Sequence, residues 1–191
     1  MRKGGGHAKG AQFEREVCVL LSKWISKGER EDLYWRSSMS GGRATLAGRK
    51  GKKLSAQAGD ISCIHPMGHR FIEKFVPECK RYHDLNFHGL LTGKGKLLDF
   101  WSELNWQATE HSKHPFLVAR QDRMPTFVCL DWQGQLELGL SDQSTTLISI
   151  PHNIRIIEIN NFFKWCKPYV ANYRGHSFHR QRKRLTPLRD I

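Results

Sequence analysis

The segment 11–27 repeats its large apolar residues at helical spacing and places one carboxylate among them. The repeat consists of Phe13, Val17, Leu20, Leu21 and Trp24. At about 100° per residue, Glu14 falls within the apolar arc, whereas Arg15 and Glu16 point away from it. A carboxylate that faces the core is costly unless something compensates its charge. A metal ion and a buried salt bridge both meet that need, and the helix alone does not decide between them.

A second acidic motif, Glu78-Cys79-Lys80, follows in a region that has the pattern of a strand. Side chains alternate along a strand, so Glu78 and Lys80 share one face and Cys79 packs on the other. Asp60 begins a shorter apolar run at 59–64, and 65–69 carries turn residues. The pattern predicts a hairpin between 59–64 and 70–80. Pro77 lacks a ladder donor, which indicates a bulge or an edge position.

These acids suit metal-dependent chemistry once Glu14, Asp60 and Glu78 lie together. Three carboxylates repel one another, and a divalent cation resolves the repulsion; Mg²⁺ prefers such oxygen ligands. One or two ions can activate water and bind a scissile phosphate. Lys80 would orient or deprotonate the water, or offset the charge that grows on phosphorus. Each motif alone is equally compatible with a surface salt bridge, so the nuclease interpretation depends on their order and spacing.

The distribution of charge indicates the substrate. The 191 residues carry 31 Lys and Arg against 18 Asp and Glu, a formal charge of +13. Non-specific attraction to polyanions is one explanation. However, residues 36–58 hold six basic residues and no acid, and the tail from Arg174 holds six basic residues with one acid. The first of these segments leads directly to Asp60, which favours a loop that tracks phosphates over a merely solvated one.

The remaining patterns predict an α/β (α+β) fold with a central mixed sheet flanked by helices. A second helix is expected at 97–113, with Leu97, Leu98, Trp101, Leu104 and Ala108 as its core face. Buried strands are expected at 115–120 and 126–130, a turn at 132–135 leading into 136–140, a strand at 154–159 and a last helix near 162–171. We expect residues 1–10 to form a flexible basic arm. A single nuclease domain should span 11–172, with its core at about 11–130, and a basic tail should follow at 173–191.

We expect a cytoplasmic protein of a bacterium or of a phage-infected cell, and cysteine usage and the lack of targeting signals support the cytoplasmic location. The five cysteines are well separated, without a Cys-x-x-Cys pair, which favours reduced core thiols over a disulfide scaffold or a zinc cluster. No stretch approaches the roughly 20 apolar residues of a membrane helix. The first residues also lack the apolar core of a signal peptide.

The set Glu14, Asp60 and Glu78-x-Lys80 resembles the PD-(D/E)xK nuclease superfamily. Within it, residues 9–16 are similar to the opening of archaeal-type Holliday junction resolvases, and 36–41 are similar to their Ser/Gly-rich basic stretch. The resemblance covers roughly residues 9–130. The chain departs from the pattern in a longer loop before Asp60, in Pro77 before the Glu, and in a region after about 135 with no counterpart.

The resemblance implies a restriction-endonuclease-like fold and a set of site residues. Glu14, Asp60, Glu78 and the backbone carbonyl of Cys79 would bind Mg²⁺, for which Mn²⁺ could substitute, and Lys80 would be catalytic. Gln107 matches an accessory polar position on the second helix. Contacts to DNA are expected from the basic stretch and the end of the strand, at Arg36, Ser38, Ser40, Arg43, Arg49, Lys50, Lys52, Lys53 and Arg81.

Three functions remain open on the sequence. The preferred one is a structure-selective endonuclease that resolves four-way junctions in recombination and repair. Such an enzyme would act as a homodimer, since symmetric cutting calls for two sites. A sequence-specific restriction-type endonuclease would need a recognition element, which 135–191 could supply. A non-catalytic DNA-binding protein on the same fold is the third, and the complete set of acids argues against it.

Overall fold

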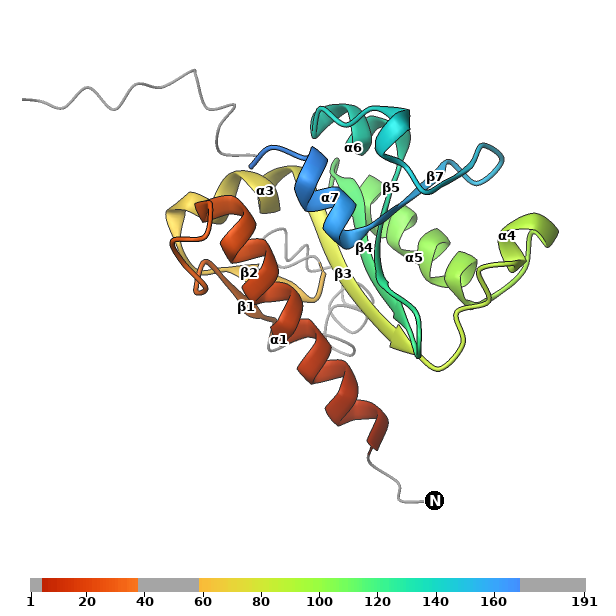
Figure 1. The fold of residues 1–191 in the computed structure, drawn as a ribbon, viewed down its shortest axis with the longest axis horizontal. Helices are drawn as coiled ribbons and strands as arrows, with labels where there is room; N and C mark the ends of the chain where they lie inside the picture. The colour runs from red at the N-terminus through yellow and green to blue at the C-terminus, as the bar shows by residue number, and fades with distance from the viewer. Residues whose placement is uncertain (1–4, 38–58, 169–191) are drawn as a thin grey trace, which may run out of the picture.

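The computed structural model describes residues 5–37 and 59–168, and its centre is a five-stranded mixed sheet with helices on both faces (Figure 1). The strand order is β3-β4-β5-β7-β6. The strands are β3 (Phe75–Tyr82), β4 (His114–Gln121), β5 (Thr126–Leu130), β6 (Leu147–Ser149) and β7 (Ile154–Glu158). Only β3 and β4 pair in parallel; the other neighbours are antiparallel. The predicted mixed sheet flanked by helices is confirmed.

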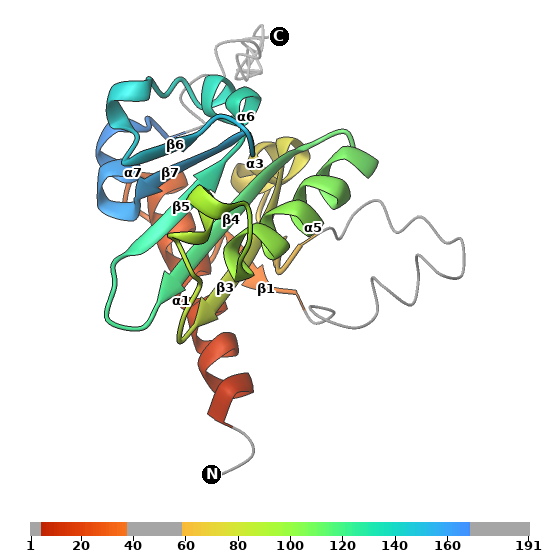
Figure 2. The ribbon, with the colours of Figure 1, turned by 90° about the vertical axis from the view of Figure 1, so that its right-hand side faces the viewer.

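Helix α1 (Gly5–Ser26) covers one face of the sheet and α5 (Lys96–Glu110) covers the other (Figure 2). The predicted core residues of α5 are all buried. Helix α5 connects β3 to its parallel neighbour β4, as a crossover between parallel strands requires. Helix α1 begins at Gly5 rather than at residue 11, so residues 5–10, expected in a flexible arm, belong to the helix.

The hairpin expected between 59–64 and 70–80 is wrong. Strand β2 (Ile61–Cys63) pairs instead with β1 (Tyr34–Arg36), which the sequence pattern did not predict. A short helical segment, η1 (Pro66–Gly68), is followed by α3 (His69–Lys74), and the strand begins only at Phe75. Phe71 and Phe75, four residues apart, stack with ring centroids 5.1 Å apart in the core. Phe71 is the buried residue of α3, and it packs there on the first residue of β3.

Two differences appear near the end of the described chain. Residues 132–137 form helix α6 (Trp132–Glu137) rather than a turn, because the side chain of Asp131 accepts a hydrogen bond from the N–H of Gly134 and caps it. The last helix, α7 (Ile159–Trp165), is capped by Glu158 and begins earlier than predicted. The short helix α4 (Gly89–Thr92) precedes α5.

The thiols behave as the sequence predicts. All five cysteines are free, and four of them are buried; Cys63 is half-buried. Burial raises the pKa of the Cys18 thiol to about 12 and also raises that of Cys129. Within the described ranges, no helix is both long enough and apolar enough to cross a membrane.

Candidate active site

Asp60 joins the two-stranded β1–β2 unit to the edge of the main sheet. Its N–H donates to the carbonyl of Pro77 at 2.9 Å, and its own carbonyl accepts from the N–H of Ser37 at 2.7 Å. Gly59 makes this approach possible: it has φ +93°, and a Cβ there would lie 2.3 Å from the Pro77 carbonyl oxygen. Because β3 is an edge strand, Pro77 lies in the edge position that its missing N–H favours.

The side chain of Asp60 is fixed against the acidic motif of β3. Its Oδ2 atom accepts a hydrogen bond of 2.9 Å from the backbone N–H of Cys79. Since the N–H and C=O of one strand residue point to the same side, the Cys79 carbonyl also faces the outer edge of β3. Asp60 is only 6% exposed. This contact places Asp60 directly beside Glu78 and Lys80.

Glu78 and Lys80 lie on the face of β3 that is covered by α5, as strand alternation predicts. Lys80 Nζ donates to Glu78 Oε1 at 2.5 Å, and it also lies 5.2 Å from the ring centroid of Phe100 on α5. Cys79 points to the opposite face, into the core beneath α1. Glu78 and Lys80 are both half-buried, so their charges act on each other in a partly desolvated corner.

Glu14 reaches the same corner from α1, where Arg36 Nε donates to its Oε2 atom. The side chain of Glu14 is 13% exposed. Glu16, two residues later, instead accepts a hydrogen bond of 2.8 Å from Arg120. The helical phase thus correctly predicted that Glu14 and Glu16 point in different directions. In this structure an ion pair with Arg36 compensates the charge of Glu14, which is the second of the two possibilities left open by the sequence.

Burial and neighbouring charges shift the pKa values of three groups at this corner. The pKa of Asp60 is raised from 3.8 to about 7, first by burial and then by the charge of Glu78. Burial also raises the pKa of Glu78, with Glu103 and Glu14 adding to the shift and Lys80 opposing it. Burial lowers the pKa of Lys80, but the charges of Glu78 and Asp60 outweigh it and the net shift is upward.

The carboxylates of Glu14, Asp60 and Glu78 are ligands of the kind that a hard divalent cation takes, although they do not form a complete metal site in this arrangement. Within residues 5–37 and 59–168, no three His, Cys, Asp or Glu side chains are grouped as a ready-made metal site. Among the described residues, Glu14 pairs with Arg36 and Glu78 pairs with Lys80, while Asp60 accepts from the backbone N–H of Cys79. Carboxylate and carbonyl oxygens are the ligands such cations take.

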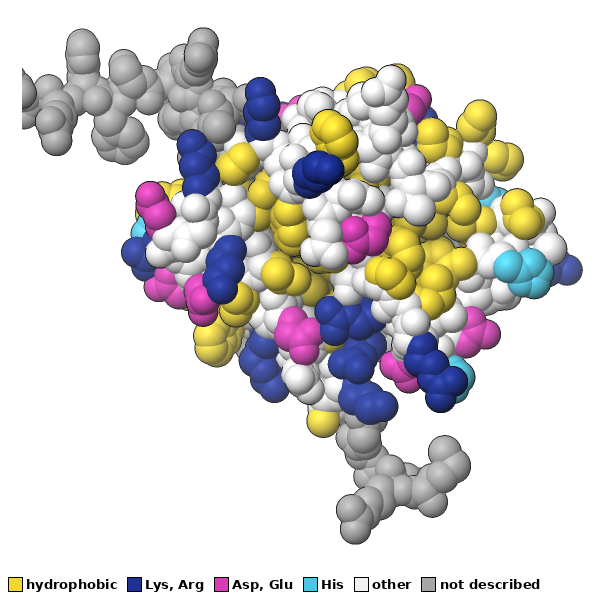
Figure 3. Space-filling view, in the orientation of Figure 1, with side chains coloured by type: hydrophobic (Ala, Val, Ile, Leu, Met, Phe, Trp, Pro, Cys, Tyr) yellow, Lys and Arg dark blue, Asp and Glu magenta, His cyan; other side chains and the backbone are white. Residues whose placement is uncertain are grey.

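Most of the expected DNA contacts lie outside the described residues, namely those of Ser38, Ser40, Arg43, Arg49, Lys50, Lys52 and Lys53. Of the other two, Arg36 pairs with Glu14, and Arg81 Nε lies 3.9 Å from Asp122 Oδ1. Figure 3 shows further Lys and Arg side chains gathered over the N-terminal half of α1 and the nearby strand ends. Basic residues on these segments include Lys9, Arg15, Arg120 and Arg123.

One flank of α5 faces this corner and carries four residues, of which the sequence analysis named only Gln107. Lys96, Phe100, Glu103 and Gln107 follow the spacing i, i+4, i+7, i+11, beside the core face of the helix. Phe100 contacts Lys80, and the charge of Glu103 acts on both Glu78 and Lys80. Gln107 therefore lies on the flank directed towards β3. The same spacing, read from the sequence, could have indicated Glu103.

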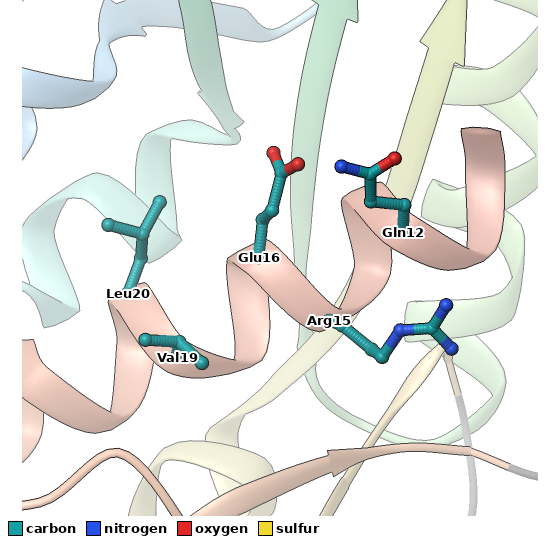
Figure 4. A pocket seen from close by; sticks show the side chains of 5 residues that line it. All are labelled: Gln12, Arg15, Glu16, Val19 and Leu20. Carbon is teal, nitrogen blue, oxygen red and sulfur yellow. The ribbon is translucent and has the colours of Figure 1, made fainter.

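One surface hollow among the described residues is separate from this corner. It has a volume of about 510 Å³ and is lined by α1 residues alone: Gln12, Arg15, Glu16, Val19 and Leu20 (Figure 4). None of the three clustered carboxylates lines it.

Together, the mixed sheet, the acid on α1, Asp60 and the Glu-x-Lys strand define a PD-(D/E)xK nuclease with a restriction-endonuclease-like fold. The family model described as "Phage putative PDDEXK endonuclease" matches residues 5–173. The chain belongs to this family, and it is an endonuclease by that membership. Nucleases of this superfamily generally use divalent metal ions. Comparisons with curated proteins and with solved structures gave no match.

Proposed function

We propose that this protein is a Mg²⁺-dependent DNA endonuclease that cuts branched DNA, with the four-way junction as its substrate. The observation that carries the proposal is the hydrogen bond from the Cys79 N–H to Asp60. It holds an acid beside Glu78 and Lys80, at a corner that Glu14 also reaches. The net charge of +13 supplies the attraction to a polyanion.

In this proposal Glu14, Asp60, Glu78 and the Cys79 carbonyl hold the cation. When bound, Mg²⁺ would activate water and stabilise charge on the phosphate and the leaving oxygen. Lys80 lies beside Glu78 in a partly desolvated position, so its ammonium group can orient the attacking water or offset charge on phosphorus. Arg36, once released from Glu14, would bind a phosphate, and Gln107 would assist from α5.

A four-way junction has two strands to cut, related by a two-fold axis. We therefore infer a C2 homodimer that presents two such corners to one junction. The basic residues along α1, the strand ends and Arg81 would bind phosphates without reading bases. Binding should accordingly weaken steeply as salt rises, because each neutralised phosphate releases counterions.

The test compares synthetic four-way junctions with linear duplexes of the same sequence, with Mg²⁺, with Mn²⁺ and with EDTA. We expect paired cuts in the junction, with little cutting of the duplex, and no cutting in EDTA. Asp60→Asn and Lys80→Ala should abolish cleavage while retaining junction binding. Lys164→Ala, on the distant helix α7, is the matched control and should cut normally.

The other outcomes identify the alternatives. Cuts at fixed sequences in linear duplex, with junctions ignored, would establish the restriction-type enzyme instead. Binding without cutting of either DNA under any metal would establish a non-catalytic protein. A monomer on bound junction DNA, measured by light scattering, would overturn the homodimer.

A further inference from the structure

An aromatic pair, one ring from the end of β3 and one from α5, lies immediately beyond the Glu-x-Lys motif. Strand alternation places Tyr82 on the same face as Glu78 and Lys80. The rings of Tyr82 and Phe100 lie with centroids 5.1 Å apart and planes inclined at 51°. Tyr82 is 42% exposed, whereas Phe100 is half-buried behind it. One ring is thus supported from below while part of its surface faces solvent.

Two lysines flank this aromatic pair. The Nζ atom of Lys80 lies 5.2 Å from the Phe100 centroid and that of Lys96 lies 5.8 Å from it. Lys80 is held by Glu78, but no carboxylate of the described residues pairs with the exposed Lys96. Lys96 therefore remains available to an external anion. An exposed ring, backed by a second ring that lies beside such a cation, suits a nucleotide, whose base can stack while its phosphate is neutralised.

We propose that Tyr82, backed by Phe100, and Lys96 bind the nucleotide next to the scissile phosphate, with its base unpaired and stacked on Tyr82. The inference rests on the proposed function and names its substrate more closely. A base inside a duplex has both faces covered by its neighbours, so only an unstacked nucleotide can offer a face to Tyr82. The substrate class is DNA that is distorted or unpaired at the cut.

A purely structural role for Tyr82, as a cover for Phe100, makes different predictions. In that case, replacing Tyr82 would lower the stability of the fold and would affect binding to paired and unpaired DNA equally. The matched control for the ring is Trp106, which lies on α5 and is 68% exposed but points away from the sheet. The control for the charge is Lys94, exposed and two residues before Lys96.

The experiment measures binding in EDTA, with fluorescent duplexes that are fully paired or carry one unpaired 2-aminopurine nucleotide. Tyr82→Ala should weaken binding to the unpaired DNA by about tenfold and binding to the paired duplex by no more than about twofold. It should also abolish the quenching of 2-aminopurine that stacking causes. Tyr82→Phe and Trp106→Ala should behave as wild type. Lys96→Ala, but not Lys94→Ala, should lower the salt dependence by about one counterion.

Equal losses on both DNAs, or unchanged quenching in a Tyr82→Ala variant whose thermal unfolding matches wild type, would overturn the inference. The protein could also show quenching that depends on Tyr82 and yet cut no DNA. That result would support this nucleotide site and contradict the proposed nuclease. If Tyr82→Ala leaves junction cutting unchanged and Tyr82 makes no difference between paired and unpaired DNA in binding, the nuclease proposal stands and the nucleotide site is wrong. The two proposals therefore fail separately.

Discussion

The carboxylate of Asp60 accepts its hydrogen bond from the N–H of Cys79, which lies between Glu78 and Lys80. This contact couples two segments that are separated in sequence and that do not form a hairpin. It is made at the edge of the sheet, where Pro77 leaves the strand without an N–H and where the Pro77 carbonyl accepts from Asp60. The position of the acid relative to the Glu-x-Lys motif is therefore set by backbone groups.

Gly59→Ala should displace Asp60 and lower stability. The added Cβ would lie 2.3 Å from the Pro77 carbonyl oxygen, so the contact between Asp60 and β3 must open. Gly28→Ala is the control, because Gly28 has nearly the same φ, +92°, with no atom within 4 Å of the added Cβ. We expect the control to lose about 1 kcal/mol from its backbone conformation and Gly59→Ala to lose at least about 2 kcal/mol more. Denaturant unfolding measures both, and equal losses would contradict the prediction.

Asp60→Asn should change how stability depends on pH. The folded-state pKa of Asp60 lies above its ordinary 3.8, at about 7, so the folded protein holds this proton more tightly than the unfolded chain. That contribution is fully present below the unfolded pKa and is lost as the pH rises through about 7. Asn keeps an acceptor for the Cys79 N–H and does not titrate.

The measurement is the free energy of unfolding in metal-free buffer at several pH values. Relative to wild type, Asp60→Asn should gain about 4 kcal/mol on going from about pH 4 to about pH 8. Added Mg²⁺ should stabilise wild type more than the variant at the higher pH. A difference between the two proteins that does not vary with pH would show that Asp60 titrates normally.

Arg36→Ala should destabilise the metal-free protein through Glu14. Removing Arg36 leaves a largely buried carboxylate without its partner, at a cost of about 1–3 kcal/mol. In a Glu14→Gln background the same change should cost less, because no charge is left behind. A double-mutant cycle in EDTA gives the coupling energy. A coupling near zero would mean that the ion pair is immaterial to stability.

Lys80→Ala should lower kcat for cleavage by at least about a hundredfold with little change in DNA affinity, since its role lies in the transition state. Lys80→Arg keeps the charge but not the shape of the ammonium group, and it should recover only part of the rate. Single-turnover cleavage measures the rate, and fluorescence anisotropy measures binding. A variant that binds poorly but cuts at the normal rate once saturated would assign Lys80 to binding alone.

The local patterns were reliable wherever a residue's neighbours in sequence decided its position. Helical phase separated Glu14 from Glu16, strand alternation placed Glu78 and Lys80 on one face, and the apolar face of α5 was identified correctly. The pattern of 70–80 misled because its first part forms α3, whose buried residue Phe71 packs against Phe75 at the start of β3. Strand β1 is three residues long, too short to give a periodic signal.

The sequence by itself determined the two layers of helix and sheet and the acids that face inwards, since periodicity is a property of the local chain. Only the tertiary structure decided which segment pairs with which: β2 with β1, Asp60 with Pro77 and Cys79, and Arg36 with Glu14. It also brought Tyr82, Phe100 and Lys96 together. These contacts depend on the crossover through α5 and on the edge position of β3, and such long-range geometry leaves no periodic trace in the sequence.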